Sequence, residues 1–126
     1  MCIRDRVLRG VGVDACAIQL DVTSEADRAA AAKYIEREFG RLDILINNAA
    51  VNLDQGAGYE TSTTPVKTIR ETFETNFFAV VDLTQKLLPL IRKSDAGRIV
   101  NVSSAQGSLK LLAAKDSTIY LSLIHI

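Results

Sequence analysis

The chain has 126 residues, 48% of them hydrophobic, and its 15 acidic side chains balance its 15 basic ones. A chain of this length forms at most one compact domain, and the balanced charge gives no sign of binding to nucleic acid or to an anionic membrane. No apolar run is long enough to span a bilayer and no secretory signal opens the chain, so we expect a cytoplasmic protein. Cys2 and Cys16 have no metal-ligand spacing, and the single histidine is His125. We therefore expect no metal site and no histidine-based catalysis.

The first six and the last six residues do not fit the pattern of their surroundings. They read Met-Cys-Ile-Arg-Asp-Arg and Leu-Ser-Leu-Ile-His-Ile, and both strings resemble peptides translated from sequencing-adapter DNA. Segments of this kind are excluded from fold reasoning. We therefore expect one incomplete domain over residues 7–120, with adapter-derived ends at residues 1–6 and 121–126.

The first predicted element is a short buried strand over residues 15–22, whose apolar run is interrupted near its end by Asp21. Thr23 and Ser24 then provide caps for a helix, and acidic residues in its first turn suit the positive end of the helix dipole. The helix continues to an expected C-terminal cap at Gly40. Its apolar face is expected to consist of Ala31, Ile35 and Phe39.

The second predicted strand lies within residues 42–50, which read Leu-Asp-Ile-Leu-Ile-Asn-Asn-Ala-Ala. Its apolar centre does not alternate, which is typical of a parallel strand covered by helices on both faces. Asn47 and Asn48 end the strand abruptly. Polar residues at this end of a parallel strand lie where open α/β sheets bind ligands, although two asparagines also suit a simple turn.

Residues 51–64 have no periodicity and are predicted to form a loop, after which Pro65 suits the first turn of a long helix. Pro89 is expected to kink or end this helix. A third buried strand is predicted over residues 98–102. The apolar face of the long helix is expected to consist of Phe73, Phe77, Val80, Val81, Thr84, Leu88 and Ile91.

Strand, helix, strand, helix, strand is the order of a parallel sheet in a layered α/β domain. Each predicted strand ends in polar residues: Asp21 in the first, Asn47 and Asn48 in the second, and Ser103 and Ser104 after the third. The carboxyl ends of parallel strands lie along one edge of a sheet. The sequence therefore predicts a binding site at that edge.

Four stretches of the chain, in this order, resemble signature segments of the short-chain dehydrogenases/reductases. Residues 20–23 (Leu-Asp-Val-Thr) resemble the segment after the family's third strand, whose aspartate contacts the adenine ring. Residues 47–50 (Asn-Asn-Ala-Ala) resemble its Asn-Asn-Ala-Gly signature, which stabilises the sheet and lines the cofactor cleft. Ala50 stands where the family usually has glycine. A side-chain amide at Asn47 can also bridge two strands.

The other two stretches match the catalytic half of the family's pattern. Asn76 matches the asparagine of the long helix that helps to hold a proton-relay water. Residues 98–104 match the fifth strand, and Ser104 takes the place of the catalytic serine. The resemblance covers nearly all of residues 7–120.

The resemblance implies an α/β fold: a partial Rossmann-type doubly wound parallel sheet, with three strands and two main helices of a three-layer sandwich. It implies hydride transfer between a nicotinamide cofactor, NAD(P) with NADP slightly favoured, and a carbonyl or alcohol substrate. Ser104 would hydrogen-bond the substrate oxygen, and Asn76 would support the water chain. The cofactor-binding residues that the resemblance implies are Asp21, Val22, Asn47, Asn48, Ala49 and Ala50.

The chain departs from the family at the proton donor, which is a tyrosine in a Tyr-x-x-x-Lys pair on the helix after the serine. None of its three tyrosines, Tyr34, Tyr59 and Tyr120, has a lysine four residues later. Residues 107–120 resemble family members with a longer loop before the active-site tyrosine. We therefore expect that tyrosine to lie beyond the chain.

The glycine-rich phosphate loop is also missing, because Gly10 and Gly12 precede a predicted strand instead of opening a helix. The doubly wound strand order 3-2-1-4-5-6 puts the two missing strands between the predicted strands of residues 15–22 and 42–50. We therefore expect the predicted strand of residues 15–22 to lack its native neighbours. The chain by itself is expected to be unstable and inactive.

The alternative is a non-catalytic α/β module that binds a nucleotide or a partner, either flavodoxin-like, receiver-like or a degenerate family member. A receiver needs clustered acidic residues at its strand ends, whereas these ends carry one aspartate, and the retained Asn76 and Ser104 favour an enzyme. The long helix with Phe73 and Phe77 has enough apolar surface for a homodimer or homotetramer interface, although these residues suit a core equally well. The substrate is not predicted beyond a small carbonyl or alcohol.

Overall fold

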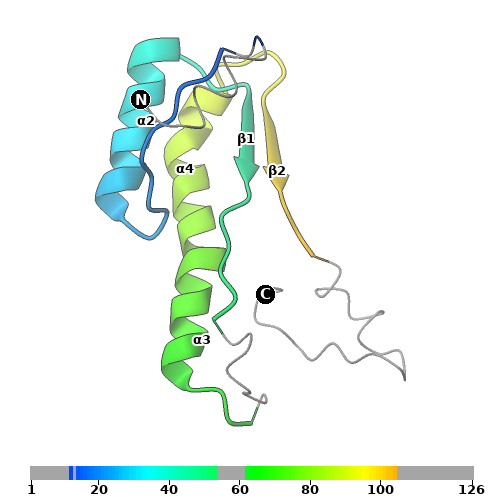
Figure 1. The fold of residues 1–126 in the computed structure, drawn as a ribbon. Coiled ribbons are helices and arrows are strands. Elements are labelled where there is room, and N and C mark those ends of the chain that lie inside the picture. The colour runs from blue at the N-terminus through cyan, green and yellow to red at the C-terminus, as the bar shows by residue number, and fades with distance from the viewer. Residues whose placement is uncertain (1–11, 13, 54–61, 105–126) are drawn as a thin grey trace.

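The computed structural model describes residue 12, residues 14–53 and residues 62–104. The expectations for both terminal hexapeptides and for residues 107–120 lie outside these residues. Figure 1 shows the elements in chain order: α2 (Glu25–Phe39), β1 (Ile44–Asn47), α3 (Val66–Phe73), the π-helix η1 (Glu74–Phe78), α4 (Ala79–Ile91) and β2 (Arg98–Asn101). In the described part of the chain, no helix is long and apolar enough to cross a membrane.

The sheet confirms the predicted parallel pairing of the second and third strands. β1 and β2 run in parallel, with Leu45 opposite Ile99 and Asn47 opposite Asn101. One further backbone hydrogen bond, from the Val102 N–H to the Asn47 carbonyl at 3.0 Å, extends the pairing beyond β2. The carboxyl ends of both strands therefore lie at the same edge of the sheet.

Helix α2 has the caps that the sequence predicts. The Ser24 hydroxyl accepts a hydrogen bond from the Asp27 N–H, and Gly40 adopts the left-handed conformation, with a φ of 71°, that closes the helix. Ala31 is buried as expected and Ile35 is half-buried, but Phe39 is exposed, contrary to the prediction. Phe39 ends the helix, and its ring packs edge-on against Tyr34 instead of entering the core.

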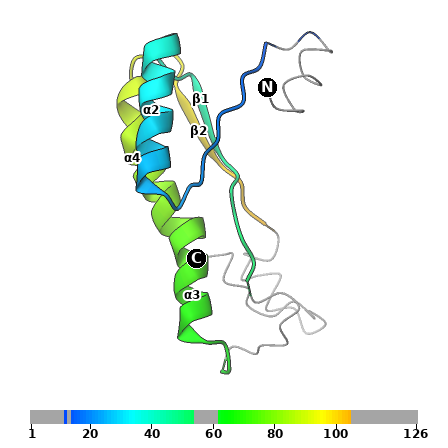
Figure 2. The same cartoon turned by 60° about the vertical axis from the view of Figure 1, so that its left-hand side comes forward.

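Both α2 and α4 pack on the same face of the sheet, as Figure 2 shows. The core lies between them and β1, and consists of Leu45, Leu83, Leu87, Leu90 and Ile91. The described residues form two layers of the three-layer sandwich, namely the sheet and the helices on this one face. Ile44 and Ile46, which point to the opposite face, are 55% and 60% exposed, because no described helix lies there. β2 is also exposed along its whole length.

The predicted buried strand at residues 15–22 is not a strand in this structure. These residues are extended, but the sheet of the described residues contains only β1 and β2, and residues 16–19 are exposed. Cys16 anchors the segment to α2, since its Sγ lies 3.0 Å from the Tyr34 Oη. An apolar sequence becomes a strand only where a neighbour completes its backbone hydrogen bonds, and this segment does not pair with β1.

The long predicted helix is present but is interrupted by η1. It begins at Val66, one residue later than predicted, with Pro65 as its N-terminal cap, and it ends two residues after Pro89. The predicted apolar face is wrong for Phe77 and Val81, which are exposed. A π-turn adds a residue to the helix, so the faces before and after it do not align. The buried residues of this run are Thr72, Ala79, Leu83, Leu87, Leu90 and Ile91.

Candidate functional site

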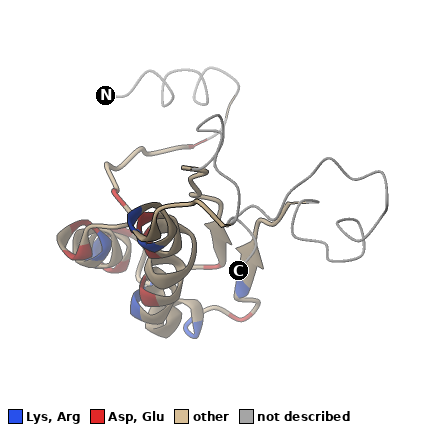
Figure 3. Ribbon diagram, turned by 90° about the horizontal axis from the view of Figure 1, so that it is seen from below, with Lys and Arg blue, Asp and Glu red and all other residues tan. Residues whose placement is uncertain are grey.

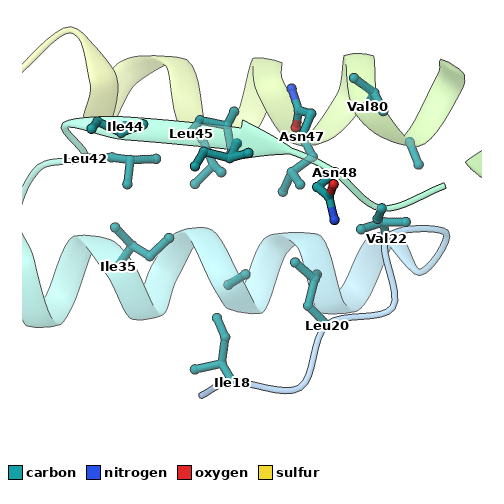
Figure 4. A pocket seen from close by; sticks show the side chains of 16 residues that line it. Ile18, Leu20, Val22, Ile35, Leu42, Ile44, Leu45, Asn47, Asn48 and Val80 are labelled. Atoms are coloured by element: carbon teal, nitrogen blue, oxygen red, sulfur yellow. The ribbon is translucent and has the colours of Figure 1, made fainter. Parts of the chain in front are cut away.

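An apolar groove of about 250 Å³ lies between β1, the inner faces of α2 and α4, and the extended segment before α2. Figure 4 shows Ile18, Leu20 and Val22 on one side of it and the side chains of β1 on the other. The polar side chains among its lining residues are those of Asn47 and Asn48. They lie at the end of β1, so the groove has one polar end.

The structure brings four of the six predicted cofactor-binding residues to this groove. Val22, Asn47, Asn48 and Ala49 all line it. The other two, Asp21 and Ala50, are their neighbours in the chain and are both exposed. The two predicted catalytic residues, Asn76 and Ser104, do not line the groove.

Asp21 organises the turn between the extended segment and α2. Its Oδ1 accepts hydrogen bonds from the Thr23 N–H at 2.9 Å and from the Thr23 hydroxyl at 2.7 Å. These bonds, helped by the nearby positive charge of Arg28, lower the pKa of the Asp21 carboxyl. The carboxylate is therefore ionised at neutral pH. Both bonds are accepted by Oδ1, so the turn does not require the second carboxylate oxygen, Oδ2.

Asn47 forms the bridge between strands that the sequence predicts. Its buried amide nitrogen donates to the Asn101 Oδ1 at 2.8 Å and lies 3.2 Å from the Thr84 hydroxyl. One side chain thus joins β1, β2 and α4 at the carboxyl edge of the sheet. Asn101 and Thr84 were not predicted as site residues; an asparagine at the end of an otherwise apolar strand was the available signal for Asn101.

The side chain of Asn76 holds the stretch that follows β1. Its amide oxygen accepts from the Val51 N–H, and its amide nitrogen donates to the Val51 carbonyl, both at 2.9 Å. Asn76 lies within η1, the interrupted part of the long helix. This pair of bonds has the geometry of strand pairing, so it fixes the backbone just after Ala50. The sequence analysis did not predict this contact.

Ser104 follows β2 by three residues and is exposed. Because β2 pairs in register with β1, Ser103 and Ser104 continue from the same sheet edge as Asn48. A serine hydroxyl in this position is able to donate a hydrogen bond to a molecule at that edge. The edge thus carries amide and hydroxyl groups from two adjacent strands.

Comparison with known proteins decides the family. A family model described as short chain dehydrogenase matches residues 5–115. The chain belongs to the short-chain dehydrogenase family. This result confirms the resemblance drawn from the sequence motifs and the Rossmann-type α/β fold that it implies.

Three members of the family illustrate the similarity. The chain is 43% identical over 106 residues to short-chain dehydrogenase anuI of Penicillium roqueforti, covering 79% of this chain and 39% of that protein. It is 39% identical over 127 residues to (-)-isopiperitenone reductase of Mentha piperita, covering 75% and 40%. A solved structure of 7α-hydroxysteroid dehydrogenase, complexed with NADH and 7-oxo glycochenodeoxycholic acid, matches with a TM-score of 0.69 and 29% identity, covering 82% and 38%. The chain thus spans about two fifths of the length of these relatives.

The sequence did not predict one partly buried ionic contact of this short-chain dehydrogenase segment. The Arg28 side chain is 9% exposed; its Nε pairs with the Asp82 carboxylate, and its Nη1 donates to the Val22 carbonyl at 2.6 Å. Arg28 therefore ties the predicted cofactor-binding turn to both helices. The available signal was its position three residues before Ala31, on the apolar face of α2.

Proposed function

We propose that this chain is part of an NAD(P)-dependent oxidoreductase that transfers hydride between a nicotinamide cofactor and a carbonyl or alcohol substrate. The observation that carries the proposal is the shared carboxyl edge of β1 and β2, because Asn48 directly follows β1 and Ser104 follows β2 by three residues at that edge. Membership of the short-chain dehydrogenase family supports it. The hydride chemistry belongs to the cofactor, and the protein supplies binding, orientation and control of one proton.

The residues at this edge fit one part of a dinucleotide. Ala49 and Ala50 are small and exposed, so a flat ligand can approach the backbone closely. Val22 and Asn48 line the groove beside them, and the Asp21 carboxylate has an oxygen that its own turn does not need. We propose that Asp21 and Val22 contact the adenine and that the stretch from Asn47 to Ala50 lines the rest of the cofactor cleft.

The catalytic roles follow from what each side chain is able to do. Ser104 donates a hydrogen bond to the substrate oxygen and stabilises the charge that develops there. Asn76 is a positioning residue, because its side chain holds Val51 and thereby the backbone of the cleft. The proton is transferred by a tyrosine next to a lysine, and the sequence of this chain contains no Tyr-x-x-x-Lys pair.

The finer points of the proposal have tests of their own. We favour NADP over NAD, which the ratio of kcat/KM for the two cofactors decides. We place the protein in the cytoplasm, which cell fractionation tests. We propose a homodimer or homotetramer, because Phe77, Phe78 and Val81 form an exposed apolar patch on the long helix. Light scattering after gel filtration measures the mass of the oligomer.

The domain boundaries are tested by sequencing the source locus through both ends of this reading frame. We expect a glycine-rich turn upstream and Tyr-x-x-x-Lys downstream, and neither terminal hexapeptide in the genome. An intact frame that includes both hexapeptides would contradict the assignment of residues 1–6 and 121–126 and would leave a protein without the catalytic pair.

The activity is tested on the complete reading frame from that locus, purified and assayed for NAD(P)H oxidation with a panel of small ketones and aldehydes. Ser104→Ala is expected to lower kcat by about a hundredfold to a thousandfold. Ser103→Ala is the matched control, because it removes the neighbouring hydroxyl from the same exposed stretch. Equal losses in both variants would remove Ser104 from the reaction. A complete protein that binds NAD(P)H without turnover of any substrate would support the non-catalytic alternative.

A further inference from the structure

We propose that Arg28 is a positioning residue for adenine recognition, which acts through the Val22–Thr23 peptide group and the Asp21 carboxylate. The inference rests on the proposed function, in which Asp21 and Val22 contact the adenine of the cofactor. Arg28 lies outside the four stretches that carry the family resemblance, and it does not line the groove. Through the turn, it sets how strongly the protein prefers adenine to a base without the amino group.

The peptide group between Val22 and Thr23 is held by both of its polar atoms. Its carbonyl, on Val22, accepts a hydrogen bond from the Arg28 Nη1 at 2.6 Å. Its N–H, on Thr23, donates to the Asp21 Oδ1 at 2.9 Å. Because a peptide group is planar, fixing the carbonyl also fixes the direction of the N–H. Arg28 therefore determines where the Asp21 Oδ1 is bound, and with it the orientation of the whole carboxylate.

The orientation of the Asp21 carboxylate decides which donors it accepts. Thr23 occupies the Oδ1 atom with its N–H and its hydroxyl, so a donor from a ligand is directed to Oδ2. The adenine amino group is such a donor, whereas hypoxanthine has an oxygen at the same place, which a carboxylate repels. A hydrogen bond to an ionised acceptor depends strongly on its geometry. A carboxylate that is already oriented accepts the amino group without the cost of ordering its side chain.

Two helices hold the Arg28 side chain in place. Arg28 lies near the start of α2, and its side chain is 9% exposed. Its Nε pairs with the Asp82 carboxylate of α4, and the other oxygen of Asp82 lies 3.6 Å from the Lys86 Nζ. Figure 3 shows basic and acidic residues on both helices and none on β1. The cation that reaches the turn therefore comes from a helix, and a second helix fixes its direction.

The stability of the fold does not explain the choice of arginine here. A guanidinium loses water on burial, and apolar residues of similar size often give equal or higher stability in its place. An apolar side chain in place of Arg28 would pack between the helices but would not donate to the Val22 carbonyl. The fork of the guanidinium reaches the Asp82 carboxylate and this carbonyl at once, through Nε and Nη1. The bond to the carbonyl is what only arginine supplies, and it acts on the turn.

The test compares the binding of NADPH and of its hypoxanthine analogue to the protein encoded by the complete reading frame. Dihydronicotinamide fluorescence measures both affinities without turnover, and the comparison is repeated with NADH. We expect the unmodified protein to bind the adenine form at least about tenfold more tightly. Arg28→Met is expected to reduce this preference about three- to tenfold, because the carboxylate must then be ordered on binding. The kcat at saturating NADPH should stay unchanged, since hydride is transferred at the nicotinamide end.

A double variant, Arg28→Met with Asp82→Leu, separates positioning from stability. It replaces both partners of the ion pair by apolar side chains, so it is expected to recover most of the stability that Arg28→Met loses. Its preference for adenine should stay reduced, because the Val22 carbonyl still lacks its donor. Arg37→Met is the matched control, since Arg37 forms an exposed ion pair on the same helix; it should keep the full preference.

Asp21→Ala distinguishes a failure of this inference from a failure of the proposed function. If Asp21→Ala loses the preference for adenine and Arg28→Met keeps it, the role of Arg28 is overturned and the adenine site remains. If the unmodified protein binds both analogues equally, or Asp21→Ala leaves the preference unchanged, the contact between Asp21 and adenine is overturned and the inference with it. Full preference in the double variant would show that Arg28 acts through stability alone and would also overturn the inference.

Discussion

An apolar stretch of chain runs along each edge of β1, but only one of the two stretches pairs with it. On one edge, the apolar residues of β2 pair in register and Asn47 bonds to Asn101. On the other edge, the equally apolar residues 15–22 run beside a groove without joining the sheet. β1 is paired with β2 on the closed side, whereas the segment across the groove does not pair with β1. An apolar run therefore predicts burial in a complete sheet, but its neighbours decide whether it becomes a strand.

The largest effect is expected from Leu87→Ala in the core. Leu87 is buried in the core between α4 and β1, so truncation leaves a cavity and lowers the free energy of unfolding by about 2–5 kcal/mol. Urea denaturation followed by circular dichroism measures this, with trimethylamine N-oxide present to stabilise the folded chain.

Ile46→Ala is the matched change at an exposed apolar residue of β1. Because Ile46 is exposed, we expect a loss of about 0.5 kcal/mol or less in the free chain. A loss as large as that of Leu87→Ala would show that Ile46 is covered in the folded chain.

The second largest effect is expected from Asn47→Ala. The change leaves the Asn101 side chain without its donor and removes the contact with Thr84, so we expect a loss of about 1–3 kcal/mol in the same denaturation experiment. Asn48→Ala is the control, because Asn48 is adjacent and exposed and should change stability by about 0.5 kcal/mol or less. Equal losses would mean that Asn47 does not bridge the strands.

A smaller effect is expected from Arg28→Met, which disconnects the open-side segment from the helices. The methionine keeps apolar contact but loses the bonds to Asp82 and to the Val22 carbonyl. We expect a loss of about 1–2 kcal/mol, because Asp82 is 37% exposed and water screens part of the ion pair. Hydrogen exchange should also accelerate at residues 20–24. Arg37→Met, at an exposed pair in the same helix, should leave both readouts unchanged.

The smallest effect concerns pH. Hydrogen bonds from Thr23 lower the pKa of Asp21, so the folded state binds this proton less readily than the unfolded state does. The resulting stabilisation is present above the unfolded pKa and is lost as the pH falls through the lower folded pKa. Thr23→Val removes the hydroxyl and should reduce the acid-induced loss of stability between neutral pH and pH 2, measured by denaturation at each pH. An unchanged pH profile would contradict the role of this hydroxyl.

The sequence by itself determined the features that depend on local chemistry. Ser24 and Gly40 fix the ends of α2 because capping uses neighbouring backbone groups. The parallel order of β1 and β2 follows from two apolar runs separated by a long helix. The family motifs could also be identified from the sequence, since they are short strings of residues. The match over residues 5–115 confirms the family that they indicated.

The tertiary structure alone decided which apolar surfaces are covered. Ile44 and Ile46 belong to the same run as Leu45, yet only Leu45 faces a helix. The π-turn at η1 rotates the helix face, so Phe77 is exposed while Leu83 and Leu87 are buried. Arg28 and Asp82 are 54 residues apart in the sequence, and Asn76 and Val51, which hydrogen-bond to each other, are 25 residues apart. Burial and contacts of this kind depend on which elements lie side by side, and no local pattern of residues specifies that arrangement.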